Sequence, residues 1–144
     1  MVSAMFVVVL FLKIRPHCRV SAISSIRLSG GILTTWDPLF GDFQSFSNIV
    51  GLLVEGNMKD FDGKLHFLNV YAPYRDRLSF WSRVESSGLL KMENMFLGGD
   101  LNLMLGPSEI WGGSTLVDPL VGYFKDLFIS SNLIDMSLLV PEPT

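Results

Sequence analysis

The sequence has 144 residues, a length that favours one domain over two and allows it to bury roughly 68–70% of the surface that the unfolded chain exposes. It is 49% hydrophobic and 17% charged, with a mean hydropathy of +0.40, so it is more apolar than a typical self-contained soluble domain. The net charge of −3 argues against attraction of nucleic acid by the protein as a whole, although local Arg and Lys clusters can still attract it.

The cysteine and histidine content restricts metal chemistry. Cys18 is the single cysteine, which excludes an internal disulfide and favours a reducing, intracellular compartment. With His17 and His66 as the two histidines, no closed Cys/His zinc site can be assembled. Adjacent His17 and Cys18, without further soft ligands, indicate an incidental pair. His66 lies in an apolar alternating run, where we expect a packing or hydrogen-bonding role.

The N-terminal segment carries a nine-residue apolar run, residues 4–12, followed by Lys13, Arg15 and Arg19. This run is too short to span a bilayer, which takes about 20 apolar residues. A signal peptide carries its positive charges before the apolar core, whereas here they follow it. We therefore expect a buried strand or a non-native start and no stable membrane partner. A signal or signal-anchor sequence and an interfacial segment are the alternatives.

Three strands are predicted next. The run "ILTTW" (32–36) is rich in β-branched and aromatic residues and ends at an Asp-Pro turn. The segment 43–54 alternates imperfectly, and "GNMKDFDG" (56–63) then supplies the Gly, Asn and Asp of a hairpin connection. The third strand is "KLHFLNVY" (64–71). Its period of two places on one face Leu65, Phe67, Asn69 and Tyr71.

Two helices and a further strand follow. Apolar residues at helical spacing between residues 76 and 91 predict a helix with arginines on its other side. The run "NMFLGG" (94–99) indicates a short buried strand. Residues 117–128 follow the i, i+3, i+4, i+7 pattern, and Pro119 suits the first turn of that helix. The C-terminal segment 133–144 is strand-like. Strands in series with two intervening helices predict a layered α/β domain.

Asp100 and Asn102 follow the short strand in "LGGDLN" (97–102). A carboxylate can bind Mg²⁺ or orient a water, and an amide can donate to a phosphate oxygen. The rim of the sheet, where these residues are expected, is where ligands of layered α/β folds bind. Asp and Asn beside glycine are also what any tight turn selects, so the two residues alone do not distinguish a catalytic turn from an ordinary one.

The order of four segments is more specific than any one of them. These segments are "SGGILTTWDP" (29–38), "LNVYAPYRDRLSFW" (68–81), "LGGDLNLMLGPSEIWGG" (97–113) and "FKDLFISSNLIDM" (124–136). Together they resemble the endonuclease/exonuclease/phosphatase superfamily, and most closely the endonuclease domain of plant LINE-type retrotransposons. The resemblance leaves residues 1–21 as an unmatched apolar segment and residues 22–144 as an incomplete domain. It implies a partial DNase I-like fold, a sandwich of two sheets flanked by helices.

The resemblance implies roles for three residues at the centre of a catalytic site. Asp100 matches the aspartate of the family's G-D-x-N motif, which activates or positions the attacking water, and it is also the candidate Mg²⁺ ligand. Asn102 matches the asparagine that contacts the scissile phosphate. Tyr71 matches the tyrosine of the "NVYAP" strand, whose hydroxyl reaches the phosphate or the groups bound to the metal.

Three further residues are candidates for substrate binding. Asn69 shares the strand face of Tyr71 and is positioned to support the site, with a hydrogen bond to a neighbouring loop as the alternative role. Arg75 and Arg77 follow the strand where a DNA backbone would pass, and either could neutralise phosphate. Solvated arginines at the start of a helix are the alternative.

The sequence also departs from the family pattern. The family begins with a strand that bears an asparagine, followed by a metal-binding glutamate, and the segment before residue 22 has neither arrangement. The family ends with a later aspartate and an Asp-His pair, and this chain stops at Thr144 before either. Glu109 matches part of a family Ser-Glu pair, for which we expect a loop-bracing role instead of metal binding.

We therefore expect a fragment of a metal-dependent phosphodiesterase, a DNA endonuclease of retroelement type, with Mg²⁺ as the implied cofactor and DNA as the implied partner. We expect no efficient nuclease activity from the chain as written, since the groups of such a site act as a unit. The missing remainder of the same domain is a further expected partner, and its loss would leave an apolar face uncovered. The alternatives are a non-catalytic retroelement remnant, a short membrane-associated or secreted protein, and a phosphatase acting on small phosphate esters.

Overall fold

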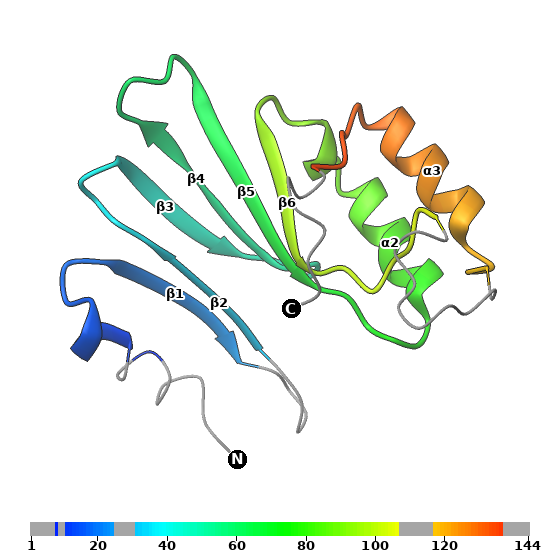
Figure 1. Ribbon diagram of the computed structural model, residues 1–144, viewed down its shortest axis with the longest axis horizontal. Coiled ribbons are helices and arrows are strands. Elements are labelled where there is room, and N and C mark those ends of the chain that lie inside the picture. The colour runs from blue at the N-terminus through cyan, green and yellow to red at the C-terminus, as the bar shows by residue number, and fades with distance from the viewer. Residues whose placement is uncertain (1–7, 9–10, 25–30, 107–116, 137–144) are drawn as a thin grey trace. The chain divides into compact units, whose positions relative to one another are not determined.

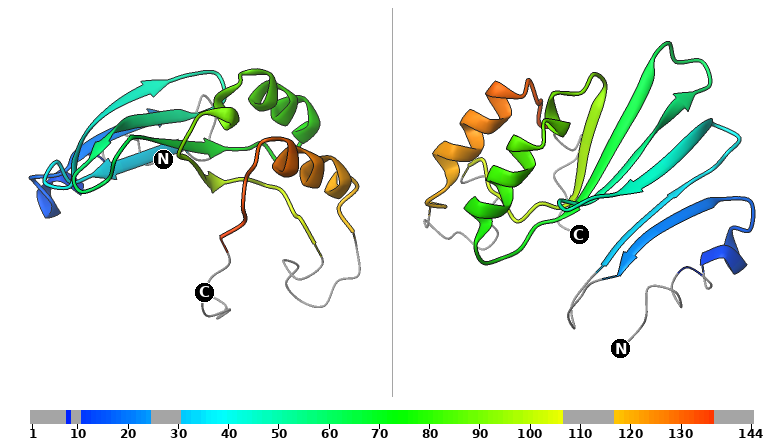
Figure 2. Two further views of the ribbon diagram at one scale, coloured as in Figure 1. Left: turned by 90° about the horizontal axis from the view of Figure 1, so that it is seen from above. Right: turned by 180° about the vertical axis from the view of Figure 1, so that it is seen from behind.

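The structure is a computed structural model that describes residues 8, 11–24, 31–106 and 117–136. The chain divides into two compact units, Met1–Asn102 and Leu103–Thr144. The residues described form a mixed α/β structure with a two-stranded sheet, a four-stranded sheet and helices, shown in Figures 1 and 2. The expected α/β class is therefore confirmed.

Both sheets belong to the first unit. Its strands are β1 (Arg19–Ser24), β2 (Gly31–Trp36), β3 (Gly41–Ser47), β4 (Leu52–Met58), β5 (Lys64–Tyr71) and β6 (Met95–Asp100). Strands β1 and β2 pair antiparallel in a sheet of their own, and the other four lie in the order β3-β4-β5-β6. Strands β3, β4 and β5 pair antiparallel in sequence, whereas β6 runs parallel to β5. The strands predicted at 32–36, 64–71 and 94–99 are confirmed as strands, but the expected burial of the third is wrong, because none of the β6 residues is buried in this edge strand.

The parallel pair β5-β6 needs a crossover connection. Helix α2 (Arg77–Ser86) and the short 3-10 helix η1 (Leu89–Lys91) supply it. The helix predicted over 76–91 is confirmed in type but is shorter, because Gly88 adopts a left-handed φ of 74° between the two elements. The buried side chains of α2 are Phe80, Trp81 and Val84.

The core of the first unit lies on the central strands and on α2. Its buried apolar residues are Val50, Leu52, Leu53, Val54, Leu65, Leu68, Val70, Ala72, Phe80, Trp81, Val84 and Leu90. Strand β5 is central in the four-stranded sheet and is buried on both faces over most of its length. Because its neighbours hold it on both sides, β5 provides a fixed support for the residues that follow its C-terminal end.

His66 is part of this core. Its Nδ1 atom lies 2.8 Å from the backbone oxygen of Glu93, and its Nε2 atom lies 3.6 Å from Oε2 of Glu55. Glu55 is the residue opposite His66 in the β4-β5 register. The expected packing and hydrogen-bonding role of His66 is confirmed.

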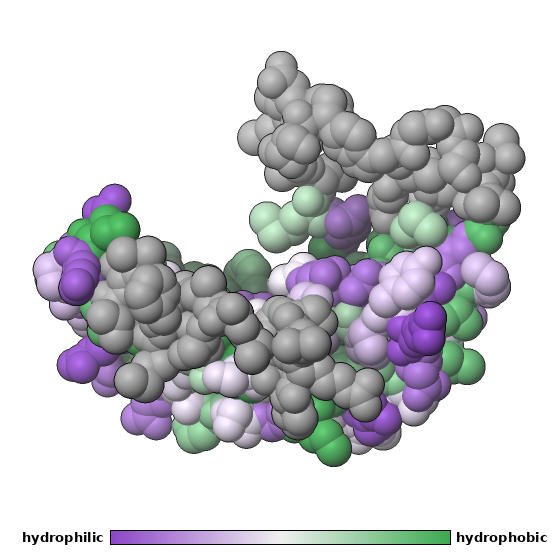
Figure 3. Space-filling view, turned by 90° about the horizontal axis from the view of Figure 1, so that it is seen from below, coloured by the Kyte–Doolittle hydropathy of each residue, from purple (hydrophilic) through white to green (hydrophobic). Residues whose placement is uncertain are grey.

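Strand β6 carries part of an aromatic row. The ring of Phe67 stacks on that of Phe96 with centroids 5.0 Å apart and meets Phe43 edge-on at 5.9 Å. Phe43 and Phe67 are half-buried, whereas Phe96 on the edge strand β6 is 43% exposed. Apolar exposure in this row is therefore found at its β6 end. Figure 3 shows hydrophobic residues interspersed with hydrophilic ones on one face of the molecule.

The prediction of one strand over 43–54 is wrong, because the chain reverses inside it. Strand β3 ends at Ser47 and β4 begins at Leu52. Between them, Oδ1 of Asn48 accepts hydrogen bonds from the backbone N–H groups of Val50 and Gly51, both at 3.0 Å. This Asx turn makes the reversal. The predicted connection at 56–63 is correspondingly shorter, since its first three residues continue β4.

The second unit contains helix α3 (Val121–Ser130), whose buried residues are Phe124 and Leu127. The helix predicted over 117–128 is confirmed in type but begins later. Asp118 forms a turn before it, with Oδ1 accepting from the N–H of Leu120 at 3.0 Å. Pro119 lies in this turn, so its predicted place in the first helical turn is wrong.

Both ends of the chain depart from the predicted strands. Of residues 4–12, the structure describes Val8, Phe11 and Leu12, and all three are helical. The strand predicted there is therefore wrong at these positions. Residues 133–136 lie in no strand, and the rest of the predicted C-terminal strand lies outside the residues described.

Candidate functional site

Tyr71 and Asp100 end two neighbouring parallel strands. The register of β5 and β6 places them opposite one another, and the N–H of Ala72 donates to the backbone oxygen of Asp100 at 2.8 Å. Both residues are exposed. The carboxyl ends of parallel strands are where layered α/β folds bind ligands. A phenol and a carboxylate, 29 positions apart in the sequence, are thus brought to one edge of the sheet.

Gly99 allows β6 to approach β5 closely just before Asp100. Its φ is +111°, a region that only glycine enters without strain. A Cβ atom at this position would lie 2.1 Å from the backbone oxygen of Val70 and 2.6 Å from Oδ1 of Asn69. By contrast, a Cβ at Gly98 would meet nothing within 4 Å. The second glycine of the motif is therefore required by the geometry of the strand end.

Asn102 is held in place by two hydrogen bonds. Its Nδ2 group donates to the backbone oxygen of Ala72 at 2.7 Å, and its own backbone oxygen accepts from Nη1 of Arg77 at 3.1 Å. Its φ of 44° lies in the left-handed region, which asparagine tolerates better than most residues. The segments after β5 and after β6 are thereby tied to each other and to the start of α2.

Asn69 links the two sheets of the first unit. Its Nδ2 group donates to Oγ1 of Thr34 on β2 at 2.9 Å, while its Oδ1 atom lies beside Gly99. The Nδ2 group therefore has its hydrogen-bond partner within the protein. This geometry gives Asn69 a supporting position behind Tyr71 and Asp100.

The two arginines of the candidate site differ in their surroundings. Arg77 is half-buried at the first position of α2 and contacts Asn102, whereas Arg75 is exposed in the loop before the helix. Asp76, between them, adopts a left-handed φ of 58° as the N-terminal cap of α2. The site therefore gathers Tyr71, Asp100, Asn102 and Arg77, with Arg75 on the adjoining loop.

The acids and histidines that would complete a hydrolytic centre are not gathered here. Within the part of the chain that the structure describes, Asp100 belongs to no group of three or more candidate metal ligands. His66 pairs with Met95 near the other end of β5, roughly 17 Å along the strand from Tyr71. Ser108 and Glu109, the Ser-Glu pair of the family resemblance, lie outside the residues described.

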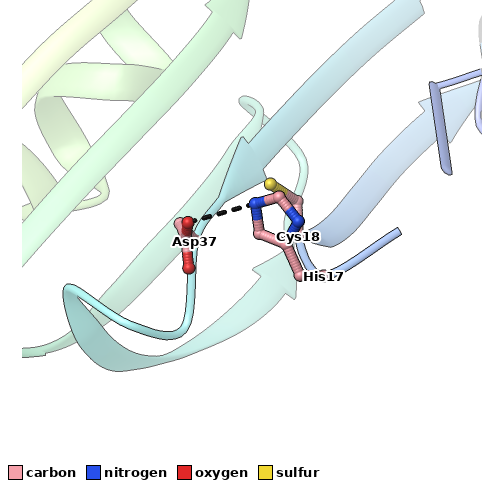
Figure 4. A group of neighbouring side chains, drawn as sticks. All are labelled: His17, Cys18 and Asp37. Carbon is pink, nitrogen blue, oxygen red and sulfur yellow. Dashed lines mark ion pairs between the residues drawn. The ribbon is translucent and has the colours of Figure 1, made fainter. Parts of the chain in front are cut away.

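One cluster of candidate metal ligands was not predicted from the sequence. His17, Cys18 and Asp37 offer three ligand atoms that all lie within 4.8 Å of one another (Figure 4). Asp37 is 19 positions from Cys18 in the sequence and was assigned only to a turn. The pairing of Arg19 with Trp36 in the β1-β2 register brings Asp37 close to Cys18. The sequence did not predict the strand over 19–24 on which this pairing depends.

The comparisons with known proteins add no relative: no family model matches the chain, and no curated protein matches it. Among the residues described, no helix is both long and apolar enough to cross a membrane.

Proposed function

We propose a function for the place where β5 and β6 end, here called the β5-β6 edge, which holds Tyr71, Asp100 and Asn102 with Arg75 and Arg77 beside them. It is the phosphate-binding part of a metal-dependent phosphodiesterase site of the endonuclease/exonuclease/phosphatase type, in its retroelement DNA endonuclease form. This chain alone binds the DNA backbone without cutting it efficiently. The observation that carries it is the joint placement of Tyr71 opposite Asp100, with Asn102 anchored to Ala72. These are the positions that the family resemblance assigns to water activation and phosphate contact.

The finer fold assignment, a partial DNase I-like sandwich, belongs to the same proposal. Its support is the contact between the two sheets of the first unit, where β2 lies against β5. The hydrogen bond from Asn69 to Thr34 crosses this contact. A polar link behind the catalytic edge suits a sandwich in which both sheets support one site.

The donor set at this edge suits phosphate better than a metal ion. The phenol of Tyr71 and the guanidinium of Arg75 are hydrogen-bond donors, and Arg75 adds positive charge. A Mg²⁺ ion bound without substrate would need several oxygen ligands in octahedral geometry, commonly one or two carboxylates. Asp100 supplies one carboxylate and, among the residues that the structure describes, belongs to no group of three or more candidate ligands. Asp100 alone would not complete the octahedral shell of Mg²⁺, so an ion held here would need oxygen atoms from water, from a bound phosphate or from further residues.

The proposed roles follow from this geometry. Arg75, exposed on the loop, neutralises a phosphate of the DNA backbone. Arg77 and Ala72 hold Asn102 in its left-handed conformation, so its side chain stays at the edge. Asp100 orients a water beside the bound phosphate. Cleavage in the family further depends on a general base and a metal-holding acid acting with these groups.

Fluorescence anisotropy with a short labelled duplex at low salt tests the binding part of the proposal. Arg75→Ala should weaken binding several-fold and lower the salt dependence by roughly one counterion. The matched control is Arg83→Ala, since Arg83 is exposed on α2 and bonds to Ser79. It removes the same charge at another place and should leave affinity nearly unchanged.

Two results would contradict the proposal. Equal losses in the two arginine variants would indicate attraction by overall charge, and no measurable binding of the unmodified chain would favour a remnant without specific activity.

A further inference from the structure

A second cluster of chemically active side chains lies at the end of the two-stranded sheet. Nε2 of His17 is 3.3 Å from Oδ2 of Asp37, and the Sγ atom of Cys18 completes a set of three ligand atoms within 4.8 Å of one another. Figure 4 shows the three side chains converging from two chain segments. This cluster is separate from the residues of the β5-β6 edge.

The β1-β2 pairing assembles the cluster. The antiparallel register ends with the pair Arg19 and Trp36, so continuing it by one position sets Cys18 opposite Asp37. His17 precedes Cys18 in a turn, where the N–H of Cys18 donates to the backbone oxygen of Arg15 at 3.2 Å. Because the alternation of a strand does not apply in a turn, the side chains of neighbouring His17 and Cys18 can converge.

The carboxylate of Asp37 is oriented by its own turn. Its Oδ1 atom accepts the N–H of Leu39 at 2.8 Å, and its backbone oxygen accepts the N–H of Phe40 at 3.1 Å. This leaves Oδ2 as the atom that faces His17. A hydrogen bond on one carboxylate oxygen that fixes the other is the outer support that metal-binding carboxylates usually have.

We propose that His17, Cys18 and Asp37 bind a divalent transition metal of the zinc class. One thiolate, one imidazole and one carboxylate are ligands that Zn²⁺ and Co²⁺ accept, and the thiolate disfavours Mg²⁺ and Ca²⁺. Three protein ligands leave the fourth tetrahedral position to water. The side chain of His17 is 51% exposed and that of Asp37 20% exposed, which gives the ion a path from solvent.

An ion pair between His17 and Asp37 is the simpler reading of the 3.3 Å contact. Such a pair needs no thiol, whereas the proposed metal site does. The behaviour of Cys18 in the presence of metal therefore distinguishes the two interpretations. Cys18 is the single cysteine of the sequence, and any thiol signal from the protein therefore reports on this cluster alone.

The test titrates the full chain, purified under reducing conditions, with Co²⁺ and follows the sulfur-to-cobalt charge-transfer absorption. We expect saturation at one ion per chain and displacement by Zn²⁺ but not by Mg²⁺. Cys18→Ser should remove the absorption. Asp37→Asn retains an oxygen for the N–H of Leu39 and should lower the affinity by roughly 10–100-fold. Asp42→Asn, which neutralises an exposed acid on β3, should leave the affinity unchanged.

A second readout covers a Cys18 variant that fails to fold. Alkylation of Cys18 in the unmodified chain should slow by about tenfold or more with Zn²⁺, because metal-bound thiolate is withdrawn from reaction. Mg²⁺ should not slow it, and Asp37→Asn should lose the protection. The proposal is overturned if Co²⁺ binding does not saturate, if Asp42→Asn matches Asp37→Asn, or if Zn²⁺ leaves the alkylation rate unchanged.

Discussion

The side chain of Asn102 donates to the backbone oxygen of Ala72 at 2.7 Å and so ties the segment after β6 to the segment after β5. The two residues are 30 positions apart, and the crossover through α2 separates them in sequence. This contact fixes the amide that the family resemblance assigns to phosphate. Asn102 therefore has a structural role alongside the proposed functional one.

Asn102→Gly tests the structural role. Glycine adopts the φ of 44° easily, so the change removes the hydrogen bond with little backbone strain. We expect a loss of about 1–2 kcal/mol in the free energy of unfolding, and a larger loss for Asn102→Ala, which adds strain. Urea unfolding followed by circular dichroism measures both. A stability unchanged in both variants would show that the Ala72 contact does not hold this segment.

Gly99→Ala should be among the most damaging single changes in the protein. The added Cβ would lie 2.1 Å from the backbone oxygen of Val70, at a φ of +111°. Overlap with a backbone atom forces β5 and β6 apart, and we expect a loss of several kcal/mol or a failure to fold. Gly98→Ala is the control, since nothing lies within 4 Å of its Cβ, and it should change stability by less than about 1 kcal/mol. Similar thermal midpoints for the two variants would contradict this account.

Thr34→Val tests the polar link between the sheets. Valine has nearly the shape of threonine but cannot accept the hydrogen bond from Asn69, whose part-buried amide then loses its partner. We expect a loss of about 1–3 kcal/mol in unfolding free energy. Thr35→Val, at the neighbouring exposed position of β2, is the matched control and should have little effect. An equal effect of both changes would attribute the loss to strand composition and not to the link.

The chain should leave supercoiled plasmid intact in the presence of Mg²⁺ or Mn²⁺. Among the residues described, Asp100 belongs to no group of three or more candidate metal ligands, and His66 lies toward the other end of β5. Gel electrophoresis after incubation measures this. Nicking that disappears in Asp100→Ala would refute the expected inactivity, whereas nicking that persists in that variant would indicate a contaminating nuclease.

The local periodicity of the sequence predicts some of these elements well and others poorly. Strand β5 was predicted to the residue, since a segment rich in Gly, Asn and Asp precedes it and Pro73 follows shortly after its end. The prediction for segment 43–54 failed because Ile49 and Val50 lie between the two turn residues Asn48 and Gly51, and these apolar side chains resemble a continuation of the strand. Helix α3 begins later than its apolar pattern does because Asp118 forms a turn within that pattern.

The two sites also differ in how well the sequence predicts them. Tyr71, Asp100 and Asn102 could be grouped from sequence, since a family pattern supplied the pairing of two segments that local periodicity leaves unrelated. The cluster of His17, Cys18 and Asp37 could not, because it depends on the register of β1 with β2 and on a strand that was not predicted. Long-range register decides which distant side chains meet, and no local pattern in this sequence encodes it.

The most direct test of the central claim is an NMR titration of the isotope-labelled chain with a short DNA duplex at low salt. We predict that the largest shifts fall on the backbone amides of Ala72, Arg75, Arg77 and Asn102, around the β5-β6 edge. The competing basic cluster is Lys13, Arg15 and Arg19 near the N-terminus. Shifts confined to that cluster, or spread evenly over the surface, would contradict a phosphate-binding role for the edge that holds Tyr71 and Asp100.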